Sequence, residues 1–298
     1  MAGRALITGL SGFTGHYVAS ELRALGYEVF GLDANNATAE GNSVVDLRDG
    51  DALQRLVFSI QPDVVVHLAA VAFVAHSDVT DMYSSNIVGT RNLLQALALC
   101  DKTPDKVLLA SSANIYGNPS VSIIHESYVP RPENDYGVSK YAMEMMARCW
   151  QEQLPIVITR PFNYTGVGQS LAFLLPKIVD HFARRQPRIE LGNIDVYRDF
   201  SDVRVVANAY ARLLSAGEPG ETYNVCSGVA YSIEDVLSML ATLAGYAIEV
   251  EVNPAFVRAN EIKHLTGSNQ KLVSTLGTLA SIPLADTLQW MYESQLKA

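Results

Sequence analysis

Short apolar runs alternate with stretches of helical periodicity along the first two-thirds of the chain. The apolar runs are rich in Val, Ile and Leu and alternate little with polar positions, which is typical of strands buried on both faces of a parallel sheet. They occupy residues 4–10, 27–33, 63–70, 106–112 and 155–163, and the helical stretches occupy residues 14–26, 51–60, 86–100 and 139–153. This order predicts an α/β fold with right-handed crossovers and a doubly wound parallel sheet of the Rossmann type.

Three glycines lie between the first expected strand and the first expected helix. The segment LITGLSGFTGHYVASEL contains Gly9, Gly12 and Gly15. Glycine allows a tight turn and a close approach of a pyrophosphate, which then meets the free N–H groups of the helix start. The spacing G-x-x-G-x-x-G differs from the commonest dinucleotide fingerprint, and a plain strand-to-helix turn would also use it. Its position after a strand and at the start of a helix favours dinucleotide binding.

Beyond about residue 165 the rhythm changes to helices with shorter, interrupted strands. This change predicts a second, smaller and mostly C-terminal α/β domain for the substrate, with the chain crossing back once to the first domain. We expect the dinucleotide-binding domain to comprise residues 1–164 and about 199–232. The substrate domain would comprise residues 165–198 and about 233–298.

Two aspartates follow the second and third expected strands. Asp33 ends the second strand in EVFGLDANN, and Asp46 lies in VVDLRD after the third. An acid at the first position accepts hydrogen bonds from a ribose diol and repels a 2′-phosphate, which favours NAD(H), with NADP(H) as the alternative. Asp46 is expected near the adenine. The competing interpretations are a turn aspartate for Asp33 and a helix N-cap for Asp46.

A serine, a tyrosine and a lysine are expected to meet at the carboxyl ends of the central strands. Ser112 follows the strand KVLLA, and Tyr136 and Lys140 lie four residues apart in NDYGVSK. Four residues apart on a helix, two side chains share a face. A nearby ammonium would lower the pKa of the tyrosine, which could then exchange a proton with a carbonyl oxygen during hydride transfer. Alone, a Y-x-x-x-K pair also fits a half-buried tyrosine beside a solvated lysine.

Composition and charge exclude several other classes of protein. Net charge is −9 without a basic stripe, so we expect no nucleic-acid partner. No apolar run approaches the roughly 20 residues that span a bilayer, and no secretory signal precedes the first strand. The three scattered cysteines fit a reducing cytoplasm and lack metal-ligand spacing. We therefore expect a cytoplasmic enzyme with neither membrane contact nor metal.

The order and spacing of several motifs resemble the extended short-chain dehydrogenase/reductase family over nearly the whole chain. The motifs are TGLSGFTG, HLAA, the NIVGTRN segment around Asn86, SSANIYG, YGVSK and RPFN. The resemblance implies that Ser112, Tyr136 and Lys140 are catalytic, with Lys140 also holding the nicotinamide ribose. It implies that the coenzyme is bound by Gly9, Gly12, Phe13, Thr14, Gly15, Asp33, Asp46, Leu47, Leu68, Ala69, Ala70, Tyr136, Lys140 and Phe162.

Within that family, the C-terminal half is similar to the GDP-4-dehydro-6-deoxy-D-mannose reductases, which form GDP-D-rhamnose. The similarity implies a nucleotide-sugar substrate, GDP-linked in the first instance, held by Asn163, Arg198, Arg258 and Glu261. Arginine suits a diphosphate because its planar fork makes bidentate contacts. The competing interpretation for both arginines is a surface ion pair, because Asp199 directly follows Arg198.

Three departures from the family pattern bear on the substrate and coenzyme. Asn114 stands where related dehydratases have a glutamate that moves a proton, which argues against a dehydratase and leaves Asn114 a substrate-orienting role. Asp33 is acidic where some reductases lack an acid. Tyr164 and Val167 replace the more usual His and Pro.

The alternatives to a reductase are a nucleotide-sugar 4-epimerase on the same residues and, from another class, a non-catalytic dinucleotide-sensing protein. A sensing protein would be free to lose the tyrosine or the lysine. The resemblance also implies a homodimer, formed through the helix that carries the tyrosine and the helix that follows NIVGT.

Overall fold

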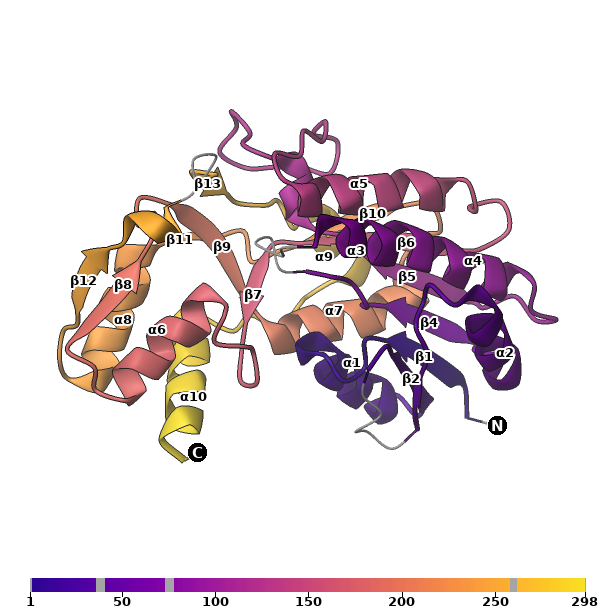
Figure 1. Ribbon diagram of the computed structural model, residues 1–298, viewed down its shortest axis with the longest axis horizontal. Helices are drawn as coiled ribbons and strands as arrows, with labels where there is room; N and C mark the ends of the chain where they lie inside the picture. The colour runs from indigo at the N-terminus through magenta and orange to yellow at the C-terminus, as the bar shows by residue number, and fades with distance from the viewer. Residues whose placement is uncertain (1, 36–40, 73–77, 258–261, 298) are drawn as a thin grey trace.

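The computed structural model describes residues 2–35, 41–72, 78–257 and 262–297. Within these ranges, a parallel seven-stranded sheet forms the larger part of the molecule (Figure 1). In spatial order its strands are β10 (Thr222–Val225), β6 (Ile156–Pro161), β5 (Lys106–Ala110), β4 (Val64–His67), β1 (Arg4–Thr8), β2 (Glu28–Asp33) and β3 (Asn42–Val44). The strand order reverses between β1 and β4, which is the ligand-binding switch point of a doubly wound fold. The predicted fold class is confirmed.

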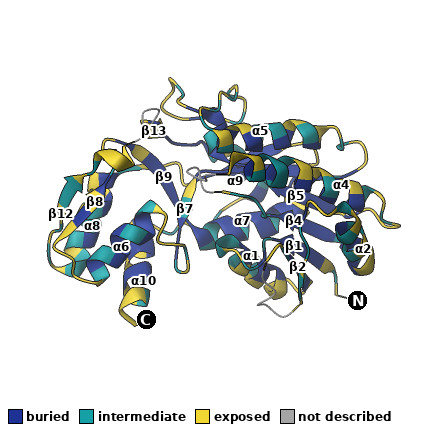
Figure 2. Ribbon diagram, viewed as in Figure 1, coloured by how far each residue is buried: buried dark blue, intermediate teal, exposed yellow. Residues whose placement is uncertain are grey.

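Helices cover both faces of this sheet. On one face lie α1 (Phe13–Ala24), α7 (Val203–Ala216) and α9 (Gln270–Leu276), and on the other lie α2 (Gly50–Ile60), α4 (Thr90–Ala98) and α5 (Asp135–Arg148). Successive strand residues alternate between the two apolar cores: Ile7 and Val66 pack toward α7, whereas Leu6 and Val65 pack toward α4. All four are buried, which explains the nearly continuous apolar runs in the sequence (Figure 2).

The helix before α4 is irregular. The chain enters it through α3 (Val79–Tyr83) and a π-helical turn, η1 (Ser84–Gly89). Apolar periodicity predicts a continuous helix here and gives no signal for the wider turn. Such turns occur mostly as local bulges and often at functional sites. Here the turn contains Asn86, from the NIVGT motif.

A smaller unit follows β6 in the chain and lies at the other end of the molecule (Figure 1). Its sheets are built from β7 (Asn163–Thr165), β8 (Arg188–Leu191), β9 (Tyr197–Asp202), β11 (Ala230–Ser232), β12 (Glu249–Val252) and β13 (His264–Leu265). They pack with α6 (Leu174–Ala183), α8 (Ile233–Ala244) and α10 (Leu284–Lys297) around a separate apolar core. Two short 3-10 turns, η2 (Ala113–Tyr116) and η3 (Pro254–Phe256), complete the described elements.

The strand pairings refine the expected division into domains. The segment that returns to the large sheet is α7 and β10, while β9 and β11 pair with each other in the smaller unit. Helix α9 packs on the large unit, because Leu272 and Leu276 belong to its core. We keep a two-domain division as a proposal, with boundaries moved by these pairings from those read in the sequence.

No helix in the described ranges is long and apolar enough to span a membrane. The three cysteines are free. No group of three or more potential metal ligands occurs among the described residues.

Candidate active site

The catalytic candidates meet at the carboxyl end of β5, as expected for an open α/β sheet. Ser112 lies just beyond β5, and Tyr136 lies in the first turn of α5. That turn is fixed by Asn134, whose side-chain oxygen accepts from the Gly137 N–H at 2.8 Å. A hydrogen bond from Ser112 reaches the Tyr136 oxygen. The structure thus brings together a serine and a tyrosine that are 24 residues apart in the sequence.

The Tyr136 hydroxyl is held in its neutral form. Burial raises the pKa of Tyr136 above its ordinary value, and the neighbouring Tyr164 phenol raises it further. The hydrogen bond from Ser112 lowers the pKa only in part. A neutral phenol is a proton donor, so the group is poised to protonate an oxygen that gains negative charge.

Lys140 is buried on the same helix face but does not act on the tyrosine as expected. Its ammonium donates to the Ala110 carbonyl oxygen at 2.7 Å. Burial lowers the pKa of Lys140 to about 8, and the negative charge of Glu144 partly offsets this. The expectation that Lys140 lowers the pKa of Tyr136 is wrong for this structure, because burial dominates at the phenol. One Lys140 N–H is used by Ala110, and an ammonium has three, which leaves capacity for a ribose hydroxyl.

This lysine predicts an alkaline limit to activity. Tyr136 stays protonated well into alkaline solution, so loss of its proton does not set that limit. The Lys140 ammonium loses its proton as pH rises through about 8, and with it the charge available to coenzyme. We expect kcat/KM to fall across that pH range, measured with saturating sugar in overlapping buffers. A limit near the ordinary lysine pKa would contradict this assignment.

Asn114 contacts the catalytic serine. Its backbone N–H and its side-chain Nδ2 both lie 3.1 Å from Ser112 Oγ and donate to it. The two donors occupy the acceptor positions of the hydroxyl, so its hydrogen is left to point at Tyr136 or a substrate oxygen. Asn114 therefore orients Ser112, and any contact with substrate stays a prediction.

The variant Asn114→Asp tests this arrangement, because it replaces a donor by an acceptor of nearly the same shape. The carboxylate would attract the Ser112 hydrogen and turn it away from Tyr136. We expect kcat to fall roughly tenfold, and less for Asn114→Ala, which adds no charge. Full activity of Asn114→Asp would mean that the amide oxygen, and not the nitrogen, faces Ser112.

The glycine loop forms a cradle that fits a dinucleotide. A Cβ at Gly15 would lie 2.3 Å from the Gly9 carbonyl oxygen, and one at Gly9, where φ is +78°, would lie 2.9 Å from the Ala69 nitrogen. Helix α1 starts directly after Gly12, with no side-chain cap and no acid in its first turn. Its first N–H groups are thus open to an anion at the positive end of the helix dipole.

Of the two aspartates, one faces this loop. Asp33 Oδ2 accepts from the Ser11 N–H at 3.0 Å and from Asn42 Nδ2 at 2.6 Å. The carboxylate is thereby held at the end of β2, beside the cradle. This geometry supports the expected contact with a ribose diol.

Asp46 has a different partner. Its carboxylate forms an ion pair with Arg48 at 2.5 Å, and Arg48 also bridges to Asp81. The competing N-cap interpretation is wrong, because Asp49 caps α2 and accepts from the Ala52 N–H. Adenine binding by Asp46 stays a prediction, and it would involve a carboxylate already engaged by Arg48.

The remaining coenzyme candidates occupy two kinds of position. Leu68, Ala69 and Ala70 follow β4 at the sheet edge and are half-buried. By contrast, Leu47 and Phe162 are buried among apolar side chains, which leaves mainly their backbones for a coenzyme.

Tyr164 links the cradle to the catalytic tyrosine. Its hydroxyl lies 2.9 Å from Thr14 Oγ1, and its ring stacks on Phe13 with centroids 6.1 Å apart. Through its effect on the pKa of Tyr136 it is also a neighbour of the catalytic phenol. The sequence marked this position only as a departure from the family pattern, and its place between Phe13, Thr14 and Tyr136 needed the structure.

The predicted substrate residues are distributed over the second sheet. Asn163 is exposed on β7, and Arg198 is buried on β9, where it donates to the Tyr197 carbonyl oxygen at 3.0 Å. Asp199 points elsewhere and accepts from the backbone of Ser227 and Gly228. The competing interpretation of an Arg198–Asp199 surface pair is therefore wrong. Arg258 and Glu261 lie outside the described residues.

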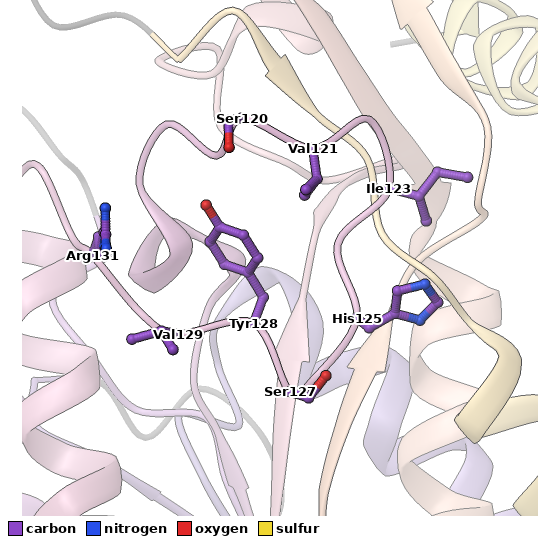
Figure 3. Close-up of a pocket in the computed structure, with 8 residues that line it drawn as sticks. All are labelled: Ser120, Val121, Ile123, His125, Ser127, Tyr128, Val129 and Arg131. Carbon is purple, nitrogen blue, oxygen red and sulfur yellow. The ribbon is translucent and has the colours of Figure 1, made fainter.

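A separate hollow lies on the loop between η2 and α5 (Figure 3). Its volume is about 480 Å³ and its lining comes entirely from residues 120–131. The lining includes His125, Tyr128 and Arg131, and none of the serine, tyrosine and lysine candidates. This hollow is distinct from the carboxyl edge of the large sheet.

The fold and this edge of the sheet together are those of an NAD(P)-dependent α/β enzyme. The model of the NAD dependent epimerase/dehydratase family matches residues 5–226. The chain belongs to that family, and the resemblance to the extended short-chain dehydrogenases/reductases is confirmed.

Two curated relatives match over nearly their whole length. GDP-6-deoxy-D-talose 4-dehydrogenase of Aggregatibacter actinomycetemcomitans is 35% identical, with 98% of each chain covered. GDP-6-deoxy-D-mannose reductase of Pseudomonas aeruginosa is 36% identical, with 97% of this chain and 96% of the relative covered. The protein is thus a nucleotide-sugar enzyme of the NAD(P)-dependent family that acts as a 4-keto reductase, dehydrogenase or epimerase.

A crystal structure from Burkholderia cenocepacia J2315 superposes with a TM-score of 0.94, at 51% identity and with 99% of each chain covered. Other solved relatives contain NADPH in one case and NAD in another.

Proposed function

We propose that this protein reduces the 4-keto group of a nucleotide-linked 4-keto-6-deoxyhexose, in the first instance GDP-4-dehydro-6-deoxy-D-mannose to GDP-D-rhamnose. The observation that carries the proposal is the neutral Tyr136 phenol, hydrogen-bonded to Ser112 at the switch point of the sheet. A ketone gains negative charge on its oxygen as hydride arrives, and two hydroxyl donors meet that charge. The two GDP-sugar relatives support the choice of substrate.

In the proposed reaction, the chain's own residues position the sugar and move one proton. Tyr136 gives its proton to the C4 oxygen, and Ser112, oriented by Asn114, donates a hydrogen bond to the same oxygen. Lys140 holds the nicotinamide ribose with the N–H groups not used by Ala110. The bound nicotinamide supplies the hydride to C4. Asn163, Arg198, Arg258 and Glu261 are proposed to hold the nucleotide and sugar, with the arginines toward the diphosphate.

NAD(H) is the proposed coenzyme, with NADP(H) as the alternative. The Asp33 carboxylate is fixed beside the glycine cradle by Ser11 and Asn42. It would accept from the 2′- and 3′-hydroxyls of the adenosine ribose and repel a 2′-phosphate.

A 4-epimerase is the second candidate, supported by the named epimerases among the curated relatives. It would use the same serine, tyrosine and lysine but regenerate its coenzyme within each turnover. A non-catalytic sensing protein has less support, because Ser112, Tyr136 and Lys140 are all present and gathered at one edge of the sheet.

Coenzyme consumption separates these candidates. We would follow the near-ultraviolet absorbance of NADH and, separately, of NADPH with GDP-4-dehydro-6-deoxy-D-mannose. The proposal predicts stoichiometric loss of the reduced coenzyme, with a higher kcat/KM for NADH. Turnover of a nucleotide sugar without net coenzyme loss would favour the epimerase, and no oxidation with this or other keto sugars would remove the reductase.

We also propose a cytoplasmic homodimer that uses helix α5 and the η1–α4 segment. Apolar side chains on these elements are exposed in the single chain: Val88 by 47%, Val138 by 39% and Met145 by 37%. The free cysteines fit a reducing compartment. Light scattering would report a dimer as twice the 32.4 kDa chain mass.

A further inference from the structure

A chain of buried polar side chains runs behind the active site, outside every role assigned so far. Thr8, at the end of β1, lies with Oγ1 2.7 Å from Nδ1 of His67, at the end of β4. Nε2 of His67 lies 2.8 Å from Oγ1 of Thr90, at the start of α4. The three residues are at most 2% exposed. His67 belongs to the HLAA motif, which gave no function to its histidine.

The direction of each hydrogen bond in this chain can be worked out. The Thr90 hydroxyl donates to the Asn86 carbonyl oxygen at 2.8 Å, and that oxygen can only accept. Thr90 has then no hydrogen left for His67, so Nε2 of His67 must donate to it. A neutral imidazole carries one N–H, so Nδ1 accepts from the Thr8 hydroxyl. The backbone N–H of Ala69 completes the chain by donating to Thr8 at 3.2 Å.

His67 is therefore fixed as one neutral tautomer. Burial lowers the pKa of His67 to about 3, and the Lys140 ammonium lowers it further. A second N–H, on Nδ1, would face the Thr8 hydrogen, so protonation would also break the order of the chain. The ring is suited to hold position and not to exchange protons.

Each end of the chain leads to a different part of the active site. At one end, Thr8 directly precedes Gly9, and the Ala69 backbone is packed so closely against Gly9 that a Cβ there would clash. This is the dinucleotide cradle.

At the other end the chain reaches the π-helical turn and helix α5. The Asn86 side chain accepts from the Val71 N–H at 2.9 Å and donates to Ser139 Oγ at 3.0 Å. Ser139 in turn donates to the carbonyl oxygen of Tyr136 at 2.8 Å. The first turn of α5, which carries the catalytic phenol, is thus tied to the same turn of η1 that Thr90 holds.

We propose that His67 is a positioning residue that locks the coenzyme cradle and the Tyr136 helix in one register through Thr8 and Thr90. The inference rests on the proposed function, because it concerns the alignment of a coenzyme on the cradle with a proton donor on α5. Its loss would misalign hydride and proton transfer while leaving the coenzyme contacts of the cradle in place.

A first test needs no turnover. Long-range proton–nitrogen correlation spectra of ¹⁵N-histidine-labelled protein, with His67→Gln to assign the signal, report which ring nitrogen carries the hydrogen. The proposal predicts a neutral His67 with Nε2 protonated at neutral pH. A protonated Nδ1 would overturn the proposal, whatever reaction the enzyme catalyses.

A second test asks whether the two threonines act through the histidine. Thr8→Val and Thr90→Val each remove a hydroxyl with little change of shape, and Thr8→Ser and Thr90→Ser are the matched controls that keep it. We expect each valine variant to lower kcat roughly tenfold with less change in the Kd of NADH, and the double variant to be no worse than either. The serine variants should retain activity.

Multiplying effects, on the order of hundredfold in the double variant, would mean that the threonines act independently and would overturn the coupling. If the wild-type protein oxidises no NADH with any keto sugar, the proposed function fails. The tautomer measurement then still decides whether the chain has the inferred order.

Discussion

Replacing Tyr136 by phenylalanine is expected to lower kcat roughly 10²–10⁴-fold while leaving the Kd of NADH nearly unchanged. The substitution removes one hydroxyl from the first turn of α5 and keeps the ring. That hydroxyl is the proton donor of the proposed reaction, held neutral by burial and aligned by a hydrogen bond from Ser112. Because the glycine cradle is built from a different segment, coenzyme binding does not depend on it.

The matched control is Tyr83→Phe. Its hydroxyl also lies at the start of α5, where it donates to Asp135 Oδ1 at 2.9 Å, and it has no proposed role in catalysis. We expect this variant to retain the turnover of the wild type. Stopped-flow measurement of NADH oxidation with coenzyme titration by fluorescence would give both quantities. Unchanged turnover of Tyr136→Phe would remove this residue from the mechanism.

The second large effect is expected on stability, from the buried ion pair between Glu144 and Arg160. Arg160 Nε and Nη2 bind the two Glu144 oxygens at 3.0 and 2.8 Å, and the side chains are 3% and 0% exposed. Burial alone would lower the pKa of Arg160, but its hydrogen bonds to Glu144 raise it above the ordinary value. The pair joins α5, one turn beyond Lys140, to β6.

Glu144→Leu leaves the arginine charge buried without its carboxylate, and we expect a loss of about 3–5 kcal/mol of unfolding free energy. For a chain of this size, the melting temperature would fall on the order of 10 °C. The double variant Glu144→Leu with Arg160→Met removes both charges and should lose much less than Glu144→Leu alone.

Thermal unfolding followed by circular dichroism tests this, with Arg188→Ala as the control. Arg188 pairs with Glu251 at 3.0 Å on the surface, so its loss should shift the melting temperature little. If the double variant melts no higher than Glu144→Leu, the uncompensated charge is not the cause of the loss.

The order of strands and helices could be predicted because a parallel sheet buried on both faces leaves a strong apolar signal. Predicted strands at 106–112 and 155–163 begin within one residue of β5 and β6. The π-helical turn around Asn86 could not be predicted, because wide and ordinary helical turns have nearly the same apolar spacing. Helix α5 starts at Asp135, earlier than the apolar periodicity suggested, because the Asn134 cap and not an apolar residue fixes its start.

In the site, the sequence predicted which residues gather but not how each is oriented. Spacing on a helix placed Tyr136 and Lys140 on one face, yet the direction of the ammonium depends on the Ala110 carbonyl, from another strand. The contact of Asn114 with Ser112 is set by the geometry of a short 3-10 turn. The pairing of Asp46 with Arg48 and the chain through His67 likewise depend on side-chain directions that residue type alone does not give.

The most direct test of the central claim uses NADH with deuterium at its transferable position. After reaction with GDP-4-dehydro-6-deoxy-D-mannose, mass spectrometry and NMR locate the label and give the configuration at C4. The account predicts one deuterium at C4 of a GDP-linked 6-deoxyhexose, with the configuration of GDP-D-rhamnose, for each NADH consumed. A product without deuterium at C4, or a nucleotide sugar inverted at C4 with no coenzyme consumed, would contradict it.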